Sequence, residues 1–357
     1  MKRALFLLAC IAAAICAFAK KKTFSQYDYF NGPAFWQRVA LTHNAVPLIG
    51  PQDTAIIIAT NRDYEPDSMR FLTEHSKHNR LRWFLMYASG GRWHTHEVGS
   101  LSEAKSYLPS TNKDWVVYTE GMGKIFTSDA DRGMRMAGQY GINVLLMDYP
   151  SIRTDKGAMA NYYFAKGNAI AAYKDFLPVL DSVRILRQAD QMGSGRLSLF
   201  FHSMGNKVMK EIMQHSSAMK LNQGVWVDNI ILNAPCVAMR GHRKWVEQIA
   251  FARRIYVHYN PEDMTLKWAR IMSLHKQLGD KMRRPVSDAA VYINFNSLCD
   301  VSHSNFLGLY GRGLPPQASI QHYDQVLHGD SVAVHGAGYR ASVYRKIGWD
   351  ILPVETQ

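Results

Sequence analysis

After residue 50 the chain alternates between short apolar runs and longer segments with helical periodicity. Eight runs have the length and the β-branched or aromatic content of strands: Ala55–Ala59, Trp83–Tyr87, Trp115–Tyr118, Val144–Met147, Leu197–Phe201, Ile230–Leu232, Ile255–Tyr259 and Val291–Phe295. Near-continuous apolar runs indicate strands buried on both faces, and their alternation with helices indicates a mostly parallel sheet. The pattern predicts an α/β fold with an eight-stranded sheet and helices on both faces. The Gly90-Gly91 turn suggests that the first two strands pair antiparallel at one edge.

Three helical segments separate these runs. One follows a Ser128-Asp129 cap and stops at Gly141, a second runs from Lys156 to about Asp190 with a kink near Pro178, and a third runs from Met204 to about Met219. Residues 20–52 are expected to form a helix and loop covering the sheet. Because the chain has no repeat and no low-complexity linker, residues 53–357 are expected to form one domain.

The first residues have the pattern of a secretory signal peptide. Lys2 and Arg3 precede an apolar stretch, and the A-F-A segment at 17–19 is a cleavage signal followed by lysines. The apolar stretch of about 15 residues is shorter than the ~20 that a spanning helix needs. We expect residues 1–19 to be removed and the protein to be periplasmic or secreted. Lipidation at Cys10, in a lipobox-like L-L-A-C segment, and an uncleaved anchor are the alternatives.

The composition is that of a globular protein with a packed core, with 47% hydrophobic and 20% charged residues. Loss of Lys2 and Arg3 lowers the formal net charge from +13 to +11. The scattered basic residues favour an anionic substrate or peripheral association with an anionic envelope, and no motif for binding nucleic acid accompanies them. Cys236 and Cys299 remain after cleavage, either as a disulfide or as two buried free thiols.

The segment LSLFFHSMGNKVM, at 197–209, passes directly from a strand-like run into a helical one. A serine at such a turn is either a nucleophile at a strained strand-to-helix elbow or a helix N-cap. Gly205 provides the small residue that the elbow needs two positions after Ser203, whereas Phe201 occupies the matching position before it. His202 is expected to pack against the sheet. These residues alone leave both interpretations of Ser203 open.

Two later loops contain partners for a catalytic serine. Asp263 follows the seventh predicted strand and His303 follows the eighth. Parallel strand ends converge at one edge of a sheet, and a serine after the fifth strand followed by Asp and His is the order of the α/β-hydrolase fold. In this arrangement Ser203 attacks, His303 carries its proton, and Asp263 orients the imidazole.

Each partner has an alternative. Asp263 is also placed to cap the helix that follows it, with Glu262 as the substitute acid. His303 is also compatible with a plain surface loop, with His328 and His335 as rivals, although neither closely follows a predicted strand.

An oxyanion hole needs one N–H group from the residue after the nucleophile and one from the loop after the third strand. Met204 provides the first. Met122 provides the second, in a loop that contains Gly121 and Gly123. The two glycines are equally consistent with an ordinary turn.

With these residues in place, the chain resembles a bacterial α/β-hydrolase family of unknown function whose elbow reads A-H-S-M-G-N. The resemblance runs from about residue 53 to residue 310 and includes ATNRDY, MDYPS, HSMGN, NPEDMTL and DVSHSNF. It implies an α/β-hydrolase fold with Ser203, Asp263 and His303 as the triad. The implied activity is hydrolysis of a carboxylic ester, thioester or amide of a small or acyl-bearing substrate through an acyl-enzyme, without a cofactor.

Two departures from the family pattern support a different class of function. Phe201 replaces a small residue, and Glu120 stands where the third-strand loop usually has histidine, which places a carboxylate near the oxyanion hole. These residues favour a catalytically impaired hydrolase fold that binds an envelope partner. A metal enzyme is a third hypothesis, from these histidines: His94, His96, His322, His328 and His335. Their spacings match no common zinc pattern, so no metal site is expected.

Overall fold

The computed structural model describes these residues: 26–43, 46–78, 80–298, 301–309 and 313–354. The predicted signal peptide with its cleavage site, the alternative lipidation site Cys10 and the possible disulfide partner Cys299 lie outside the described residues. Within them, no helix combines the length and the apolar character that crossing a membrane requires.

The core of the molecule is one mostly parallel sheet. Twelve strands of the described residues form it, in the order β1-β6-β5-β2-β8-β7-β9-β10-β11-β12-β14-β13. Their bounds are β1 Val39–Thr42, β2 Ala55–Thr60, β5 Arg82–Ser89, β6 Arg92–Val98, β7 Trp115–Thr119, β8 Asn143–Asp148, β9 Leu197–His202, β10 Val227–Asn233, β11 Ala252–Tyr259, β12 Val291–Asn294, β13 Tyr339–Ala341 and β14 Trp349–Ile351. A separate hairpin pairs β3 (Arg62–Tyr64) with β4 (Leu72–Ser76).

The predicted fold class is confirmed, and the predicted number of strands is too small. All eight predicted runs are strands, and β2 pairs antiparallel with β5 as expected. However, β5 is not the edge, because β6 and β1 continue the sheet beyond it. The hairpin β3-β4 was not predicted either. The four missed strands of the main sheet lie at its two ends, where a strand is only partly covered and its sequence needs no continuous apolar run.

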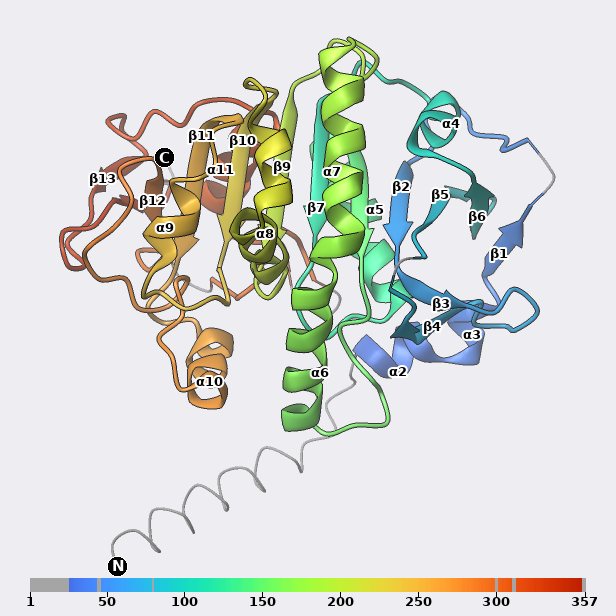
Figure 1. Ribbon diagram of the computed structural model, residues 1–357, viewed down its shortest axis with the longest axis horizontal. Helices are drawn as coiled ribbons and strands as arrows, with labels where there is room; N and C mark the ends of the chain where they lie inside the picture. The colour runs from blue at the N-terminus through green and yellow to red at the C-terminus, as the bar shows by residue number, and fades with distance from the viewer. Residues whose placement is uncertain (1–25, 44–45, 79, 299–300, 310–312, 355–357) are drawn as a thin grey trace, which may run out of the picture.

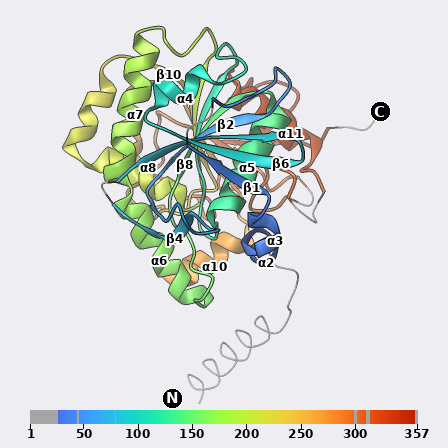
Figure 2. The same ribbon diagram turned by 90° about the vertical axis from the view of Figure 1, so that its right-hand side faces the viewer.

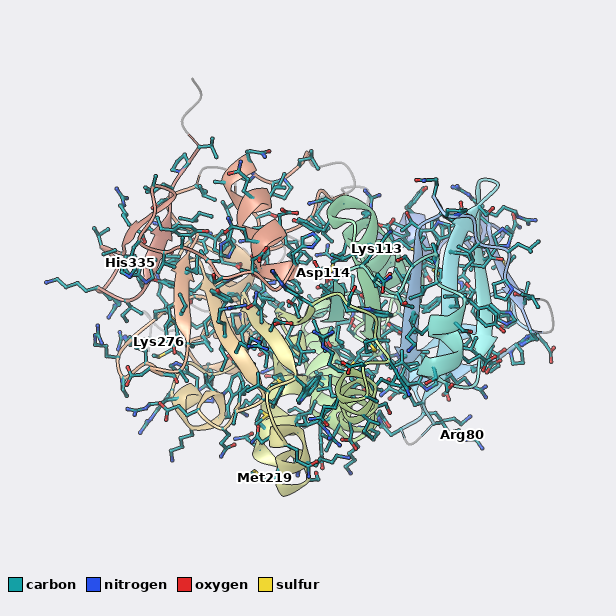
Figure 3. All side chains as sticks on the ribbon, turned by 90° about the horizontal axis from the view of Figure 1, so that it is seen from above. Arg80, Lys113, Asp114, Met219, Lys276 and His335 are labelled. Atoms are coloured by element: carbon teal, nitrogen blue, oxygen red, sulfur yellow. The ribbon has the colours of Figure 1, made fainter. Side chains whose placement is uncertain are left out.

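Helices cover both faces of the sheet. Their bounds are α2 Gln26–Asn31, α3 Pro33–Trp36, α4 Leu101–Ser106, α5 Phe126–Tyr140, α6 Ala158–Ala171, α7 Tyr173–Gln188, α8 Gly205–Gln214, α9 His242–Val246, α10 Met264–Ser273 and α11 Gln317–Leu327, with a 3₁₀ helix at Ser216–Asn222. In Figure 1, α7 and α8 lie in front of the sheet and α5 and α11 lie behind it. Figure 2 shows the twist of the strands, and Figure 3 shows side chains filling the space between the layers.

Three helix predictions need correction. The helix that ends at Gly141, where φ is 65°, begins at Phe126, because Ser128 is its third residue and accepts from the N–H of Ile125. The long second helix is divided at Ala172 into α6 and α7; Pro178 lies inside α7 and does not mark the break. The third helix ends at Gln214, and the extended residue His215 separates it from the 3₁₀ helix at Ser216–Asn222. The segment 20–52 also contributes a strand, β1.

Strand periodicity divides the core into two layers. On β2, Ile57 and Ala59 belong to the apolar cluster beneath α7 and α8, and Ile56 and Ile58 belong to the cluster beneath α5. Successive side chains of a strand point to opposite faces, so a strand covered on both sides must be apolar at every position. The polar groups of the site therefore lie at the strand ends.

Candidate active site

Ser203 occupies a strained turn between β9 and α8. Its φ is 50°, a left-handed conformation that non-glycine residues rarely adopt. A Cβ atom on Gly205 would lie 2.6 Å from the carbonyl oxygen of Thr119 and 2.8 Å from that of Glu120. Only glycine therefore lets the start of α8 come this close to the end of β7. The geometry is that of an elbow and not of an ordinary N-cap.

Two asparagines hold this elbow, and sequence reasoning missed the role of both. The Ser203 N–H donates to the Asn233 carbonyl at 2.9 Å. The Asn206 side-chain amide donates to the carbonyls of Phe201, Ser203 and Asn233. Asn206 belongs to the HSMGN motif and Asn233 directly follows the predicted strand Ile230–Leu232. Their places in the sequence could have drawn attention to them, but the sequence does not show which groups they bond.

Phe201 does not prevent the elbow from forming. Its side chain is fully buried in the apolar cluster that also contains Met204 and Val208. Its carbonyl accepts the Asn206 amide at 2.8 Å. The large side chain is thus accommodated in the core beneath α8.

Asp263 and His303 form a close pair from two different loops. Asp263 Oδ2 lies 2.6 Å from His303 Nδ1. Asp263 Oδ1 accepts the N–H of Leu266 and caps α10. Capping and imidazole binding therefore use different oxygens of one carboxylate, and the two sequence interpretations of Asp263 are compatible.

The environment keeps the Asp263 carboxylate ionised. Burial raises its pKa, but the charge and hydrogen bond of His303 and the N–H groups of Leu266 and Thr265 lower it further, so that its net pKa is below the usual value. An ionised carboxylate on Nδ1 fixes the ring and leaves Nε2 for a proton transfer.

The loop after β7 lies directly against Ser203. A Cβ atom on Gly121 would lie 2.7 Å from Ser203 Cβ and 3.2 Å from the Met204 nitrogen. Among the described residues, the N–H groups of Met122 and Met204 donate to no protein acceptor, whereas the neighbouring Gly121 and Gly123 N–H groups do. Of the two predicted oxyanion donors, Met204 directly follows Ser203 and Met122 directly follows Gly121, the residue packed against Ser203.

Glu120 is buried and neutralised by a cation that the sequence did not reveal. Its carboxylate forms an ion pair with Arg132 of α5 and accepts the Tyr118 hydroxyl and, at 2.8 Å, the Gly121 N–H. Burial raises the pKa of Glu120, but Arg132 and other nearby groups lower it more, so that the net pKa is well below its usual value. Arg132 therefore compensates the negative charge of Glu120. The same carboxylate accepts the N–H of Gly121, the residue before Met122, and so holds this loop in place.

His202 lies next to the pair and has a different environment. Its Nδ1 lies 2.9 Å from the Asn233 side-chain nitrogen, and its Nε2 lies 3.5 Å from both Ser304 Oγ and Glu120 Oε1. Burial lowers its pKa well below the usual value, although Glu120 acts in the opposite direction. Its ring centroid is 4.7 Å from that of His303.

The rival residues are engaged elsewhere. Glu262 pairs with Lys267, and His335 packs edge-on against Trp349. His328 pairs with Asp114, which immediately precedes β7, whereas Ser203 follows the end of the parallel strand β9. Among the residues that the structure describes, no three potential ligands gather as a metal site would require.

A cleft of about 560 Å³ adjoins the loop that follows β7. Met122 forms part of its wall, although Ser203 itself does not line it. Nowhere in the described chain is a hydrogen bond formed between Ser203 Oγ and the His303 ring. Catalytic hydrogen bonds are often long in ligand-free structures and shorten in the complex with substrate.

Residues 103–305, more than half of the chain, match a family described as "Alpha/beta hydrolase of unknown function (DUF900)". A solved S-formylglutathione hydrolase from Agrobacterium tumefaciens is similar with a TM-score of 0.35 and 13% identity, over 72% of this chain and 91% of that one. No curated protein matches.

Proposed function

The chain belongs to this family of α/β hydrolases of unknown function, and from that premise we propose that it is a serine hydrolase acting on an ester-like bond. The nucleophile is Ser203, the general base is His303, and the residue that orients the base is Asp263. The observation that carries the proposal is the left-handed backbone of Ser203 at 50°, at the end of a parallel strand beside a carboxylate–imidazole pair. Strained backbone of this kind costs of order 1–3 kcal/mol and persists where the surrounding structure enforces it.

The proposed reaction begins with an attack of Ser203 Oγ on the carbonyl carbon of the substrate while His303 Nε2 accepts the hydroxyl proton. The tetrahedral intermediate collapses, the bond to the leaving group breaks, and His303 returns the proton to that group. Water then attacks the acyl-enzyme by the same proton route, which releases the acid and restores Ser203. Asp263 stays ionised throughout and stabilises the imidazolium.

The negative charge that develops on the substrate oxygen needs two donors. The N–H groups of Met204 and Met122 supply them, since neither donates to an acceptor among the described residues and Gly121, next to Met122, packs against Ser203. One donor of this type is typically worth about 10²–10³ in rate. Glu120 supports this arrangement because Arg132 compensates its charge while it holds the Gly121 N–H.

Covalent labelling tests the proposal most directly. The protein without residues 1–19 is treated with a fluorophosphonate probe, together with Ser203→Ala, His303→Ala and the control Ser304→Ala. We expect the wild type and Ser304→Ala to be labelled, because the Ser304 hydroxyl contacts His202 and, among the described residues, forms no hydrogen bond with Asp263 or His303. Loss of labelling in Ser203→Ala and His303→Ala identifies an activated serine, and esters, thioesters and amides can then be compared as substrates.

A folded wild-type protein that does not react with the probe contradicts the proposal. That result would favour a hydrolase fold that binds a partner without catalysis. Circular dichroism and thermal unfolding of the same preparations separate this outcome from simple misfolding.

A further inference from the structure

The cleft beside Met122 is lined by basic side chains. Arg70, Arg153 and Lys156 contribute to its wall, and no carboxylate of the described residues does. The wall comes from the β3–β4 connection, the turn between α2 and α3, and the loop that leads from β8 to α6. These segments come together at the lower end of the molecule in Figure 1.

The N-terminus of α6 adds a second positive feature to this cleft. Ala158, its first residue, and Asn161 line the wall. The N-cap residue is Gly157, no side chain caps the helix, and no acidic residue occupies its first turn. The free N–H groups and the helix dipole at such an end favour an anion.

The loop that carries the basic residues is held in place. Asn161, which is 3% exposed, accepts the Arg153 N–H and donates to the carbonyls of Arg153 and Lys156. Thr154 is fixed by Glu74, which binds both its N–H and its hydroxyl. These hydrogen bonds fix the backbone of the loop that carries Arg153 and Lys156.

Arg70 has N–H donors without an acceptor among the described residues. Its Nη2 donates to the Asn31 carbonyl, and its Nε is buried without an acceptor. Among the described residues, no carboxylate pairs with it. Arg153 and Lys156 do contact Asp155, but that carboxylate is 54% exposed and does not line the cleft. An exposed pair of this kind contributes little and is easily exchanged for a better placed anion.

We propose that this cleft binds an anionic group of the substrate, so that the hydrolysed ester carries a carboxylate or phosphate. The inference rests on the proposed function, because Met122 joins the cleft to the oxyanion loop. A guanidinium binds either anion through paired N–H donors, and the helix end supplies further N–H groups. Binding here would hold the reacting carbonyl beside the Met122 N–H.

Two esters matched in chain length test the inference: 4-nitrophenyl hydrogen glutarate, which carries a carboxylate, and 4-nitrophenyl valerate, which is neutral. We expect the wild type to hydrolyse the anionic ester at least tenfold more efficiently in kcat/KM. Arg70→Gln and Arg153→Gln should remove most of that preference, mainly through a higher KM for the anionic ester. The control Arg80→Gln removes one exposed charge outside the cleft and should keep the preference.

The outcomes separate this inference from the proposed function. Equal efficiency with both esters, unchanged in Arg70→Gln and Arg153→Gln, overturns the anion site and leaves the serine hydrolase intact. If neither ester is hydrolysed, calorimetry of Ser203→Ala with glutarate and with inorganic phosphate tests the cleft alone. Binding that is lost on adding Arg70→Gln and kept on adding Arg80→Gln supports the site and shows which anion it prefers. Binding that is absent, or indifferent to Arg70, overturns it.

Discussion

His202 and His303 are neighbouring imidazoles in very different surroundings. Each lies near a carboxylate, but the two carboxylates differ. Glu120, near His202, already has Arg132 as its counter-charge and lies 3.5 Å from the ring. Asp263, near His303, contacts the ring at 2.6 Å, and among the described residues it has no arginine or lysine partner.

Burial completes the difference. His202 is 1% exposed and its pKa is driven well below the usual value, so it stays neutral and structural. His303 lies on a loop at the strand ends, with a side chain that is 16% exposed. A general base must gain a proton during the reaction. An ionised carboxylate on the other ring nitrogen lowers the free energy of the protonated imidazole, and the ring must also be accessible to substrate. These surroundings support the proposal that His303, and not His202, is the base.

Matched substitutions of the two rings should give the largest difference. We expect His303→Gln to lower kcat by about 10³–10⁴, because the proton acceptor is lost. His202→Gln should lower kcat less than about tenfold, since an amide can replace part of its hydrogen bonding. Steady-state hydrolysis of a 4-nitrophenyl ester measures both. A His202→Gln protein that is folded but as inactive as His303→Gln would show that the base has been assigned to the wrong ring.

Substitutions of the two carboxylates should also have different effects. We expect loss of the Glu120 carboxylate to lower mainly stability and loss of the Asp263 carboxylate to lower mainly activity. Glu120→Gln leaves the Arg132 guanidinium buried without its counter-charge, which should cost about 3–5 kcal/mol of unfolding free energy. Asp263→Asn keeps a residue able to cap α10, so it should cost far less stability while lowering kcat by roughly 10³-fold or more. Urea unfolding and ester hydrolysis of both variants measure the contrast.

A compensating change sharpens that result. Adding Arg132→Met to Glu120→Gln removes the unpaired charge and should recover most of the lost stability. If the double variant is as unstable as the single one, then the ion pair is not the source of the cost, and Glu120 acts through its bonds to Tyr118 and Gly121.

Features with a local cause could be predicted from the sequence. The β9–α8 turn follows from an apolar run, a serine and Gly205 within a few positions, and the strand order placed Asp263 and His303 in neighbouring loops. The described structure brings these two side chains together. Their catalytic role, and that of Ser203, stays a prediction until labelling tests it.

Features that depend on contacts between distant segments could not be predicted. Glu120 was expected to weaken the oxyanion hole, and its sequence neighbours do not show that Arg132 is its ion-pair partner. Arg132 reaches Glu120 because α5 packs behind β7. The basic cleft combines Arg70 with Arg153 across the β3–β4 connection and the loop before α6. The missed strands at the ends of the sheet also depend on distant contacts, because pairing with neighbouring strands, and not an apolar run in their own sequence, defines them.

The smallest expected effect is a change in the pH dependence of stability. The pKa of folded His202 lies below its unfolded value of about 6.5, so below that pH the unfolded chain binds a proton that the folded chain does not. The free energy of unfolding therefore falls as the pH falls, by up to about 1.4 kcal/mol per unit for this ring. His202→Gln is less stable at pH 7.5, and its difference from the wild type should shrink by about 1 kcal/mol at pH 5.5. Urea unfolding at both pH values measures it, with the exposed His75→Gln as control. A difference that grows in acid would mean that folded His202 gains a proton, and the contrast between the two rings would fail.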